Sequence, residues 1–260
     1  MKKKPSILLT NDDGVNAPGI QSLWRSVKEH SHTFIVAPDS EKSGMGVATS
    51  PNTSLHIKNV SWGSHPYVWS VNGTPADCIK LGMNVILKDK QPDLIISGIN
   101  KGSNAGRCIF YSGTVGGVIE GVLQGVLGIA FSSESHKQPL FEPFEPFIFP
   151  IISFILQHPP SAGTFFNVTF PNRTDIKGLR LARQGQGFWH GNPTPLQHTD
   201  GRLSYALTDG WHFPIEDEES DIALLKKGYI TIVPIHIREW TDFSYFEQKK
   251  ELFDSSLTLE

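Results

Sequence analysis

The sequence predicts an α/β protein in which helices cover both faces of a mostly parallel sheet. Over most of the first half, short apolar runs alternate with segments whose apolar residues recur at helical spacing. Polar residues follow directly after the apolar runs, as expected where parallel strands end at one edge of a sheet. The alternation therefore predicts strand–helix–strand units rather than separate helical and β regions.

Three strands are predicted in this first half. Ser6–Thr10 is a short apolar run of the kind found in buried strands. Thr33–Ala37 is a second run, which Pro38 ends, and Asp93–Ser97 is a third, which Gly98 ends. Each run is too short for a buried helix, so we expect three strands of one sheet.

Two helices are predicted between and after these strands. From Ile20 to Val27, apolar residues recur at helical spacing between the first two strands. After the third strand, apolar residues from Val115 to Val126 fall at i, i+3, i+4, i+7, i+8 and i+11. This second pattern predicts a helix with one buried stripe.

The second half of the chain is less regular. Phe165–Phe170 and Tyr229–Pro234 read as strands, and the Gly-, Pro- and His-rich stretch Gly185–Asp200 reads as a loop or a hairpin. A change of composition near Ser132–Pro146 marks a boundary between a compact core and an additional part.

Composition excludes several classes of protein. With 16 Phe, 6 Trp and 5 Tyr in 260 residues and a net charge of −3, the chain is neither disordered nor basic enough for nucleic-acid duplexes. Cys78 and Cys108 cannot make a disulfide framework or a four-thiolate zinc site. The most apolar stretch, Phe147–Leu156, contains Pro150 and is shorter than the ~20 residues that a membrane span needs. Because the first apolar run stops after Leu9 without a signal-peptide pattern, we expect a soluble cytoplasmic protein that binds no membrane.

Oxygen-bearing side chains follow all three predicted strands. Asp12 and Asp13 come directly after the first, Ser43 follows the second, and Asn100 follows the third. The carboxyl ends of parallel strands open onto one crevice, where two carboxylates would repel each other unless a cation lay between them. Oxygen ligands suit Mg²⁺, Mn²⁺ or Ca²⁺ better than Zn²⁺. The alternative is that the two aspartates form a solvated turn with Gly14.

A second motif, Tyr111–Thr114, stands immediately before the helix predicted from Val115. A helix N-terminus offers unpaired N–H groups and the positive end of the helix dipole, and Gly113 allows a ligand to approach the backbone closely. This favours a phosphate cradle, although Ser112 or Thr114 could simply cap the helix. The stretch matches neither a P-loop nor a dinucleotide fingerprint. A cation and a phosphate cradle in one crevice indicate phosphoryl chemistry.

Five motifs together resemble the SurE family, the stationary-phase survival proteins, which are metal-dependent 5'-nucleotidases. In chain order they are Asn11-Asp-Asp-Gly14, Ala37-Pro-Asp39 with Ser43-Gly44, Gly73-Thr-Pro-Ala-Asp-Cys78, Ser97-Gly-Ile-Asn-Lys-Gly102 and Tyr111-Ser-Gly-Thr-Val115. The resemblance is dense over residues 5–132 and thinner through Asn167–Pro171, Arg183-Gln-Gly185 and Asp221–Thr241.

The resemblance implies a three-layer Rossmann-like core and a single domain over residues 1–260. Residues 1–135 would form the Rossmann-like catalytic core, and residues 136–260 would add the remaining core elements and a C-terminal hairpin or oligomerisation part. It further implies a homodimer or homotetramer in which subunits exchange C-terminal segments.

The resemblance also implies the site residues. Asp12, Asp13, Ser43 and Asn100 would bind one divalent cation per subunit, Mg²⁺ or Mn²⁺, and Asp12, Asp13 and Asn100 would be catalytic. Asn104, Ser112, Gly113 and Thr114 would hold the substrate phosphate.

The activity that the resemblance implies is hydrolysis of nucleoside 5'-monophosphates to nucleoside and phosphate. Exopolyphosphatase or 3'-nucleotidase activity at the same site is one alternative. A non-catalytic Mg²⁺-binding regulatory module is another, although a phospho-acceptor domain would need an Asp where this chain has Asn100.

Three positions depart from the family pattern. Val47 stands where a polar residue is usual, which puts contacts to the leaving group in doubt. Arg107 stands in a commonly acidic stretch and could change the preference among phosphates, and Thr169 replaces an Asn.

Other residues near the predicted site have structural alternatives. Trp189 and Trp211 could line a base pocket, or pack in a hairpin or a subunit interface. Asp77 is expected to be a helix cap or a buried hydrogen-bond anchor, and Cys108 a small packed residue.

Overall fold

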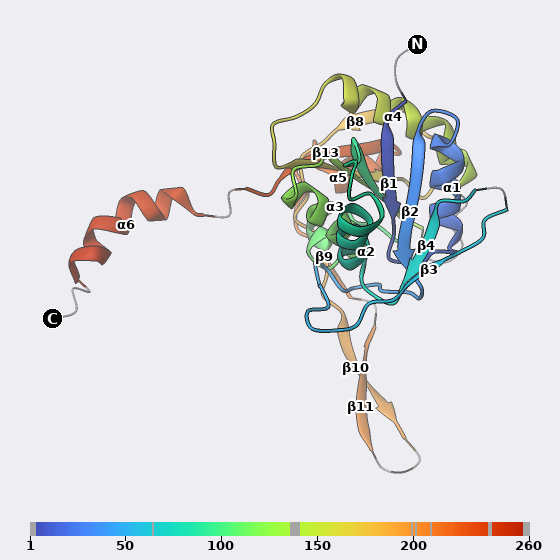
Figure 1. Cartoon of the computed structure of the whole chain (residues 1–260). Helices are drawn as coiled ribbons and strands as arrows, with labels where there is room; N and C mark the ends of the chain where they lie inside the picture. Colours follow the sequence, from blue (N-terminus) through green and yellow to red (C-terminus); the bar gives the residue numbers. More distant parts are fainter. Residues whose placement is uncertain are drawn as a thin grey trace.

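The computed structural model describes residues 4–63, 65–135, 141–198, 200, 202–208, 210–238 and 241–256. Within these residues, the main sheet has nine strands in the order β3-β4-β2-β1-β5-β6-β7-β13-β8 (Figure 1). Neighbouring strands are parallel from β4 through β2, β1, β5 and β6 to β7. β3 is antiparallel to β4 and β13 to β7, whereas β8 is parallel to β13. The prediction of an α/β protein with a mostly parallel sheet is confirmed.

The elements of the first half follow one another in this order: β1 (Ser6–Thr10), α1 (Pro18–Val27), β2 (His32–Pro38), β3 (Ile57–Asn59), β4 (Val68–Val71), α2 (Pro75–Leu81), a π-helical turn (Gly82–Ile86), β5 (Leu94–Lys101), a 3-10 turn (Gly106–Phe110), α3 (Gly113–Leu123) and β6 (Gly128–Ser133). The second half continues with a 3-10 turn (Glu142–Phe144), α4 (Glu145–Gln157), β7 (Thr164–Phe170), β8 (Leu179–Leu181), β9 (Phe188–Trp189), β10 (Asn192–Gln197), β11 (Leu203–Thr208), β12 (Trp211–His212), α5 (Asp221–Lys226), β13 (Ile230–His236) and α6 (Phe243–Ser256).

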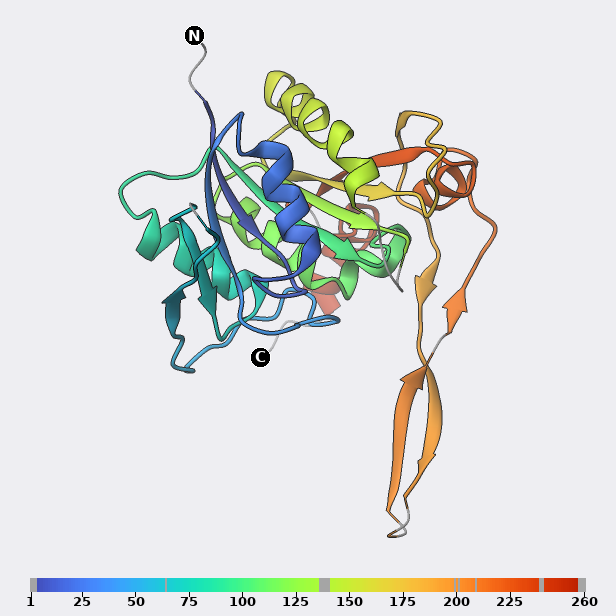
Figure 2. The same cartoon turned by 90° about the vertical axis from the view of Figure 1, so that its right-hand side faces the viewer.

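Helices cover both faces of the sheet, as the three-layer prediction requires. α1 and α4 pack together on one face (Figure 2), and α2 and α3 pack together on the other. The two-residue period of a strand explains how β1 serves both layers. Ile7 and Leu9 lie in the cluster with α1 and α4, whereas Leu8 between them lies in the cluster with α2.

Two first-half predictions need correction. The third strand does not end at Gly98: β5 runs on to Lys101, with a shift of register between Ser97 and Asn100. Gly98 lies at φ +131° with its backbone against Phe131, so a glycine bulge lets the strand resume pairing with β6. Asn100 therefore lies in the strand and not after it.

The helix predicted from Val115 to Val126 forms as α3, but it ends at Leu123. The prediction of a single buried stripe is wrong, because α3 is buried on nearly all sides except at Leu123. Gly116 and Gly121 allow this: a Cβ would lie 2.2 Å from the carbonyl oxygen of Gly46 at the first and 1.9 Å from Ile95 at the second. The glycines let α3 lie close to the sheet and to the loop after β2.

In the second half, both predicted strands form as β7 and β13, which pair antiparallel close to the β8 edge of the main sheet. Residues 185–200, read as a loop or a hairpin, contain only the first strand of the hairpin that forms: β10 pairs with β11, which lies beyond residue 200, in an arm that projects from the body (Figures 1 and 2). Of that stretch, residue 199 lies outside the described residues, as do residues 136–140 of the proposed boundary. α6 lies apart from the body in Figure 1. In the described part of the chain, no helix combines the length and apolar character that a membrane crossing needs.

Candidate active site

A cleft of about 750 Å³ opens at the edge of the sheet where β1 and β5 end. Five of the predicted site residues line it: Asp12, Ser43, Asn100, Asn104 and Ser112. They come from four separate segments of the chain. Of the four residues expected to meet where the parallel strands end, Asp12, Ser43 and Asn100 line the cleft, whereas Asp13 is not among its lining residues. Three further predicted site residues border this group. Asp13 accepts a hydrogen bond from the backbone N–H of Lys101, and the hydroxyl of Thr114 donates to Asp12. The backbone of Gly113 lies beside the Asp12 side chain.

Asp12 is buried where β1 meets the N-terminus of α3. The hydroxyl of Thr114 donates a hydrogen bond to its Oδ1, and a Cβ on Gly113 would lie 3.0 Å from its Oδ2. Burial raises the pKa of Asp12 to about 7, the Thr114 hydroxyl opposes that shift, and the neighbouring charge of Asp13 adds to it. A carboxylate in this place is expensive in free energy without a cation, although the helix dipole favours it.

Asp13 is half-buried beside it. The backbone N–H of Lys101, at the end of β5, donates to its Oδ2 at 3.3 Å. Burial raises the pKa of Asp13, and Glu41 acts in the same direction, whereas the Lys101 backbone and side chain lower it. The bond to Lys101 keeps Asp13 next to the strand position that Asn100 occupies.

Asn100 and Ser43 supply neutral oxygen atoms. The Asn100 amide nitrogen donates to the carbonyl oxygen of Gly102 at 2.9 Å, which leaves its amide oxygen as the group that can bind a cation. The Ser43 hydroxyl is exposed and donates to Glu41 at 2.8 Å. Its loop is held beside Asp12 because the N–H of Lys42 donates to the Asp12 carbonyl oxygen at 2.7 Å.

The donor set fits a hard divalent cation. It consists of two neighbouring carboxylates, a hydroxyl and an amide oxygen, and among the described residues no cluster of three or more His, Cys, Asp or Glu side chains offers a competing site. Burial raises the pKa of both Asp12 and Asp13, because the neighbouring groups do not fully offset the cost of burying the two charges. A bound cation would supply that compensation.

The phosphate side of the cleft lies at the start of α3. Ser112 caps the helix by accepting a hydrogen bond from the N–H of Val115 at 3.1 Å, so the capping alternative is correct for this residue. Its side chain also lines the cleft. Thr114 is fully buried, and its hydroxyl engages Asp12. Contact of either residue with phosphate stays a prediction.

Asn104 offers a buried amide to the cleft. Its backbone N–H donates to Ser132 at 3.2 Å and its carbonyl oxygen accepts from the amide of Asn167 at 2.8 Å, so the residue is held from two strands. Among the described residues, the side-chain nitrogen of Asn104 is buried without a hydrogen-bond partner. Such a donor is costly unless a ligand oxygen satisfies it.

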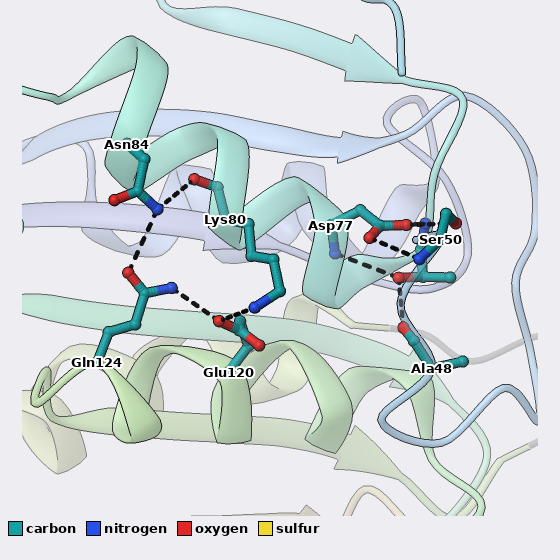
Figure 3. A network of polar contacts seen from close by, with 8 residues as sticks. Ala48, Ser50, Asp77, Lys80, Asn84, Glu120 and Gln124 are labelled. Carbon is teal, nitrogen blue, oxygen red and sulfur yellow. Dashed lines mark hydrogen bonds and ion pairs between the residues drawn. The ribbon is translucent and has the colours of Figure 1, made fainter. Parts of the chain in front are cut away.

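Asp77 anchors the loop that carries Ser43, and thus fulfils both structural expectations for it (Figure 3). It completes a capping box with Thr74 at the start of α2. It also accepts hydrogen bonds from the backbone N–H and hydroxyl of Ser50, at 3.0 and 2.7 Å. Burial acts to raise the pKa of Asp77, but these hydrogen bonds hold it below its ordinary value.

Asp221 is a further residue of this region, and its role could not be predicted from the sequence. Its carboxylate is buried and accepts hydrogen bonds from the N–H groups of Gly106 at 2.9 Å and Gly185 at 2.8 Å. It therefore ties the loop after β5 to the segment before β9. The only sequence signal was an Asp that follows Ser220 at the start of a short apolar segment, which is the usual pattern of a helix start.

Trp189 and Trp211 both line the same cleft as Asp12 and Asn100, which places them where a base pocket would be. They lie opposite each other in the short antiparallel pair of β9 and β12. Cys108 also lines the cleft and is a buried free thiol, whose pKa burial raises.

Comparison with known proteins decides the family. Residues 7–191 match the family model described as survival protein SurE. The chain belongs to the SurE family. The 5'-nucleotidase SurE of Protochlamydia amoebophila is 46% identical over 259 residues, covering 98% of this chain and 99% of that protein. The crystal structure of SurE from Aquifex aeolicus has a TM-score of 0.82 at 34% identity, and the match covers 96% of this chain and 100% of that one.

The three departures from the SurE family pattern occupy different places. Val47 lines a separate apolar groove with Phe110 and Leu123 and is absent from the lining of the described cleft. Arg107 donates to the side chain of Gln186. This bond joins the loop after β5 to the segment before β9, the same two segments that Asp221 connects. Thr169 is buried on β7, 3.1 Å from the hydroxyl of Ser132, and so supports the residue that holds Asn104.

Proposed function

We propose that this SurE family member is a metal-dependent phosphomonoesterase that hydrolyses nucleoside 5'-monophosphates to nucleoside and phosphate. The observation that carries the proposal is the cleft in which Asp12, Ser43 and Asn100 stand with Asn104 and the start of α3. The relatives named 5'-nucleotidase SurE support the substrate class.

In this proposal Asp12, Asp13, Ser43 and Asn100 hold one divalent cation per subunit, Mg²⁺ or Mn²⁺, because all four donors are oxygen atoms. When bound, such a cation supplies positive charge to the phosphate and makes a water molecule more acidic. Thr114 orients the Asp12 carboxylate, and Gly102 orients the Asn100 amide. One carboxylate of the Asp12–Asp13 pair accepts the proton of the attacking water.

The phosphate is held by Ser112, Gly113 and Thr114 at the N-terminus of α3 and by Asn104 in the loop after β5. The positive end of the helix dipole and the N–H groups of its first turn favour the negative charge that develops on phosphate oxygens. The unpartnered amide nitrogen of Asn104 donates to one of these oxygens and is thereby satisfied. Asp12, Asp13 and Asn100 are the catalytic residues of the proposal.

The experiment is a measurement of phosphate release from AMP, GMP, CMP, UMP, 3'-AMP and tripolyphosphate, with Mg²⁺, with Mn²⁺ and with EDTA. We expect release from the 5'-monophosphates that EDTA abolishes. Asp12→Asn should lower kcat/KM by more than about 100-fold at saturating cation. Asp89→Asn, in an exposed turn away from the cleft, is the matched control.

Release in EDTA at the rate seen with cation would refute the proposed mechanism. A preference for tripolyphosphate or for 3'-AMP would instead favour the alternative substrates at the same site. Cation binding without hydrolysis of any substrate would favour the regulatory module.

The same proposal includes a homodimer or homotetramer that exchanges C-terminal segments. α6 lies apart from the body and exposes large apolar side chains, among them Phe246 and Leu252 (Figure 1). A groove of about 640 Å³ on the body is lined by apolar residues that include Ile109, Leu123 and Ile235. Exposed apolar surfaces of this kind mark contacts between chains.

We further propose that residues 1–135 supply the catalytic core, that residues 136–260 supply the remaining core elements and the oligomerisation part, and that the whole chain forms one domain. β6, α4 and β7 support this, because they continue the sheet and its helical layer across the proposed boundary. A cytoplasmic location fits two buried free cysteines, which need no oxidising compartment.

A further inference from the structure

We propose that Trp189 and Trp211 form an aromatic platform on which the base of the substrate stacks. This inference rests on the proposed function and deepens it, because it assigns recognition of the base to the second half of the chain. The first half would then recognise phosphate and the second half would distinguish a nucleotide from other phosphate esters.

The proposal rests on where Trp189 and Trp211 lie, both in the cleft and in the strand pair. Both line the cleft that contains Asp12, Ser43 and Asn100, and both are half-buried, so each ring keeps exposed surface. In the β9–β12 pair Trp189 and Trp211 are direct partners. Side chains directly opposite in an antiparallel pair project from the same face of the ladder. Both side chains therefore project from the same face of this strand pair, and both line the cleft.

The strand pair that carries them is fixed to the catalytic half. The N–H of Arg107 donates to the carbonyl oxygen of Gly187 at 2.9 Å, one residue before β9. Glu216 accepts from the N–H groups of Gln186 and Gly187, at 3.0 and 2.8 Å. The N–H of His190 donates to the carbonyl oxygen of Gly210 at 2.9 Å, which joins the end of β9 to the start of β12.

The rings themselves are supported from within the second half. Trp211 stacks on Phe213, with ring centroids 5.8 Å apart and an interplanar angle of 12°. Gly191 packs against the six-membered ring of Trp189, where a Cβ would lie 2.8 Å from it. A platform that is already ordered loses little side-chain entropy when a ligand binds.

The chemistry of the platform selects one kind of substrate. Tryptophan rings give no hydrogen bond that reads a particular base, but every base has a π-face that can stack on them. Inorganic polyphosphate and ribose 5-phosphate have no aromatic ring to use this surface. The platform should therefore favour nucleotides over these compounds while it accepts all four bases.

The test compares kcat/KM for AMP, ribose 5-phosphate and tripolyphosphate in Trp189→Leu and Trp211→Leu. Leucine keeps apolar bulk, which protects the fold, but it removes the π-system. Each variant should lose about 5- to 150-fold on AMP, the range that loss of one stacking contact gives. On ribose 5-phosphate and tripolyphosphate the change should stay within about twofold. Trp189→Phe and Trp211→Phe should recover most of the activity on AMP.

Trp62→Leu is the matched control, because Trp62 packs against Trp24 on α1 and not in the cleft. An equal loss on all three substrates in Trp189→Leu or Trp211→Leu would overturn the platform, since it would show a structural role. Unchanged kcat/KM on AMP in both variants would overturn it as well.

A second readout separates this inference from the proposed function. AMP should quench tryptophan fluorescence of the full chain more than ribose 5-phosphate does, and Trp189→Leu should reduce that quenching. Binding of AMP without hydrolysis would refute the phosphatase and keep the platform. Hydrolysis of AMP with no effect of either tryptophan on its kcat/KM would keep the phosphatase and refute the platform.

Discussion

At the scale of single residues, Asp12 serves the proposed cation site at a cost in the stability of the cation-free protein. Its carboxylate is buried at the end of β1, bonded by Thr114 and next to Asp13. In the absence of a cation, burial raises its pKa to about 7 from an ordinary value of 3.8. The folded protein therefore binds a proton at Asp12 more tightly than the unfolded chain does.

This difference sets a pH dependence of stability. A carboxyl with a raised folded-state pKa stabilises the fold fully below the unfolded pKa, and that contribution is lost as pH rises to the folded value. In EDTA the protein should lose free energy of unfolding from about pH 4 to about pH 7. Asp12→Asn should remove most of that loss, and saturating Mg²⁺ should restore stability to the wild type at about pH 8 but not to the variant.

The measurement is urea unfolding at several pH values, with EDTA and with Mg²⁺. Asp89→Asn is again the control and should follow the wild type. Equal pH profiles for the wild type and Asp12→Asn would contradict the assigned role of this carboxyl.

Single residues were predictable from sequence where topology fixes their place. Asp12, Ser43 and Asn100 follow or end neighbouring strands, and parallel strands share one edge, so their meeting in the cleft could be predicted. Asp221 could not be predicted in the same way. Its partners Gly106 and Gly185 lie 115 and 36 positions away, and no local pattern relates them.

At the scale of elements, α2 is fastened at both ends, and the two ends have different consequences (Figure 3). Its N-terminus holds the loop after β2 through Asp77, Ser50 and the bond from Thr74 to the carbonyl oxygen of Ala48 at 2.6 Å. Its C-terminus holds α3 through Lys80, which lies 2.7 Å from Glu120. The loop after β2 carries Ser43, whereas the Glu120 contact lies near the far end of α3.

Asp77→Asn should therefore affect the cation site. The Asp77 carboxylate accepts hydrogen bonds from backbone N–H groups and a hydroxyl through two oxygen atoms, whereas an amide has only one acceptor oxygen. We therefore expect a loss of about 1–3 kcal/mol in the free energy of unfolding. Because the loop loosens, the Mg²⁺ concentration for half-maximal phosphate release should rise, while kcat at saturating Mg²⁺ should change less.

Glu120→Gln is the matched control, since it weakens the other end of α2. It should lower stability without changing the Mg²⁺ requirement. A similar change of the Mg²⁺ requirement in both variants would show that Asp77 acts only through stability.

The elements themselves were predictable to different degrees. Strands such as β1, β2 and β7 are apolar runs, and burial on both faces makes them visible in a sequence. β5 was predicted too short because Gly98, which usually ends a strand, here forms a bulge. The burial of α3 depends on glycines whose closeness to Gly46 and Ile95 only the tertiary structure shows.

At the scale of the whole molecule, the chain combines a compact body with two parts that project from it. The β10–β11 arm and α6 leave the body in different directions (Figure 1). The arm exposes Leu203 and Leu207, and α6 exposes Phe246 and Leu252. Neither part could be assigned a place from sequence alone, because their apolar residues do not pack on the body of their own chain.

The assembly proposal predicts that α6 supplies an interface with another copy. Phe246 is 48% exposed and Leu252 is 65% exposed, and full burial of such a side chain contributes about 1.5–3 kcal/mol. The double variant Phe246→Glu with Leu252→Glu should therefore shift the mass in solution toward the 28.8 kDa of a single chain. Light scattering after size-exclusion chromatography measures this. Glu247→Lys on the same helix changes charge without removing apolar area and should leave the assembly intact. If the double variant keeps the mass of the wild type, α6 does not hold the subunits together, and the arm becomes the segment to test next.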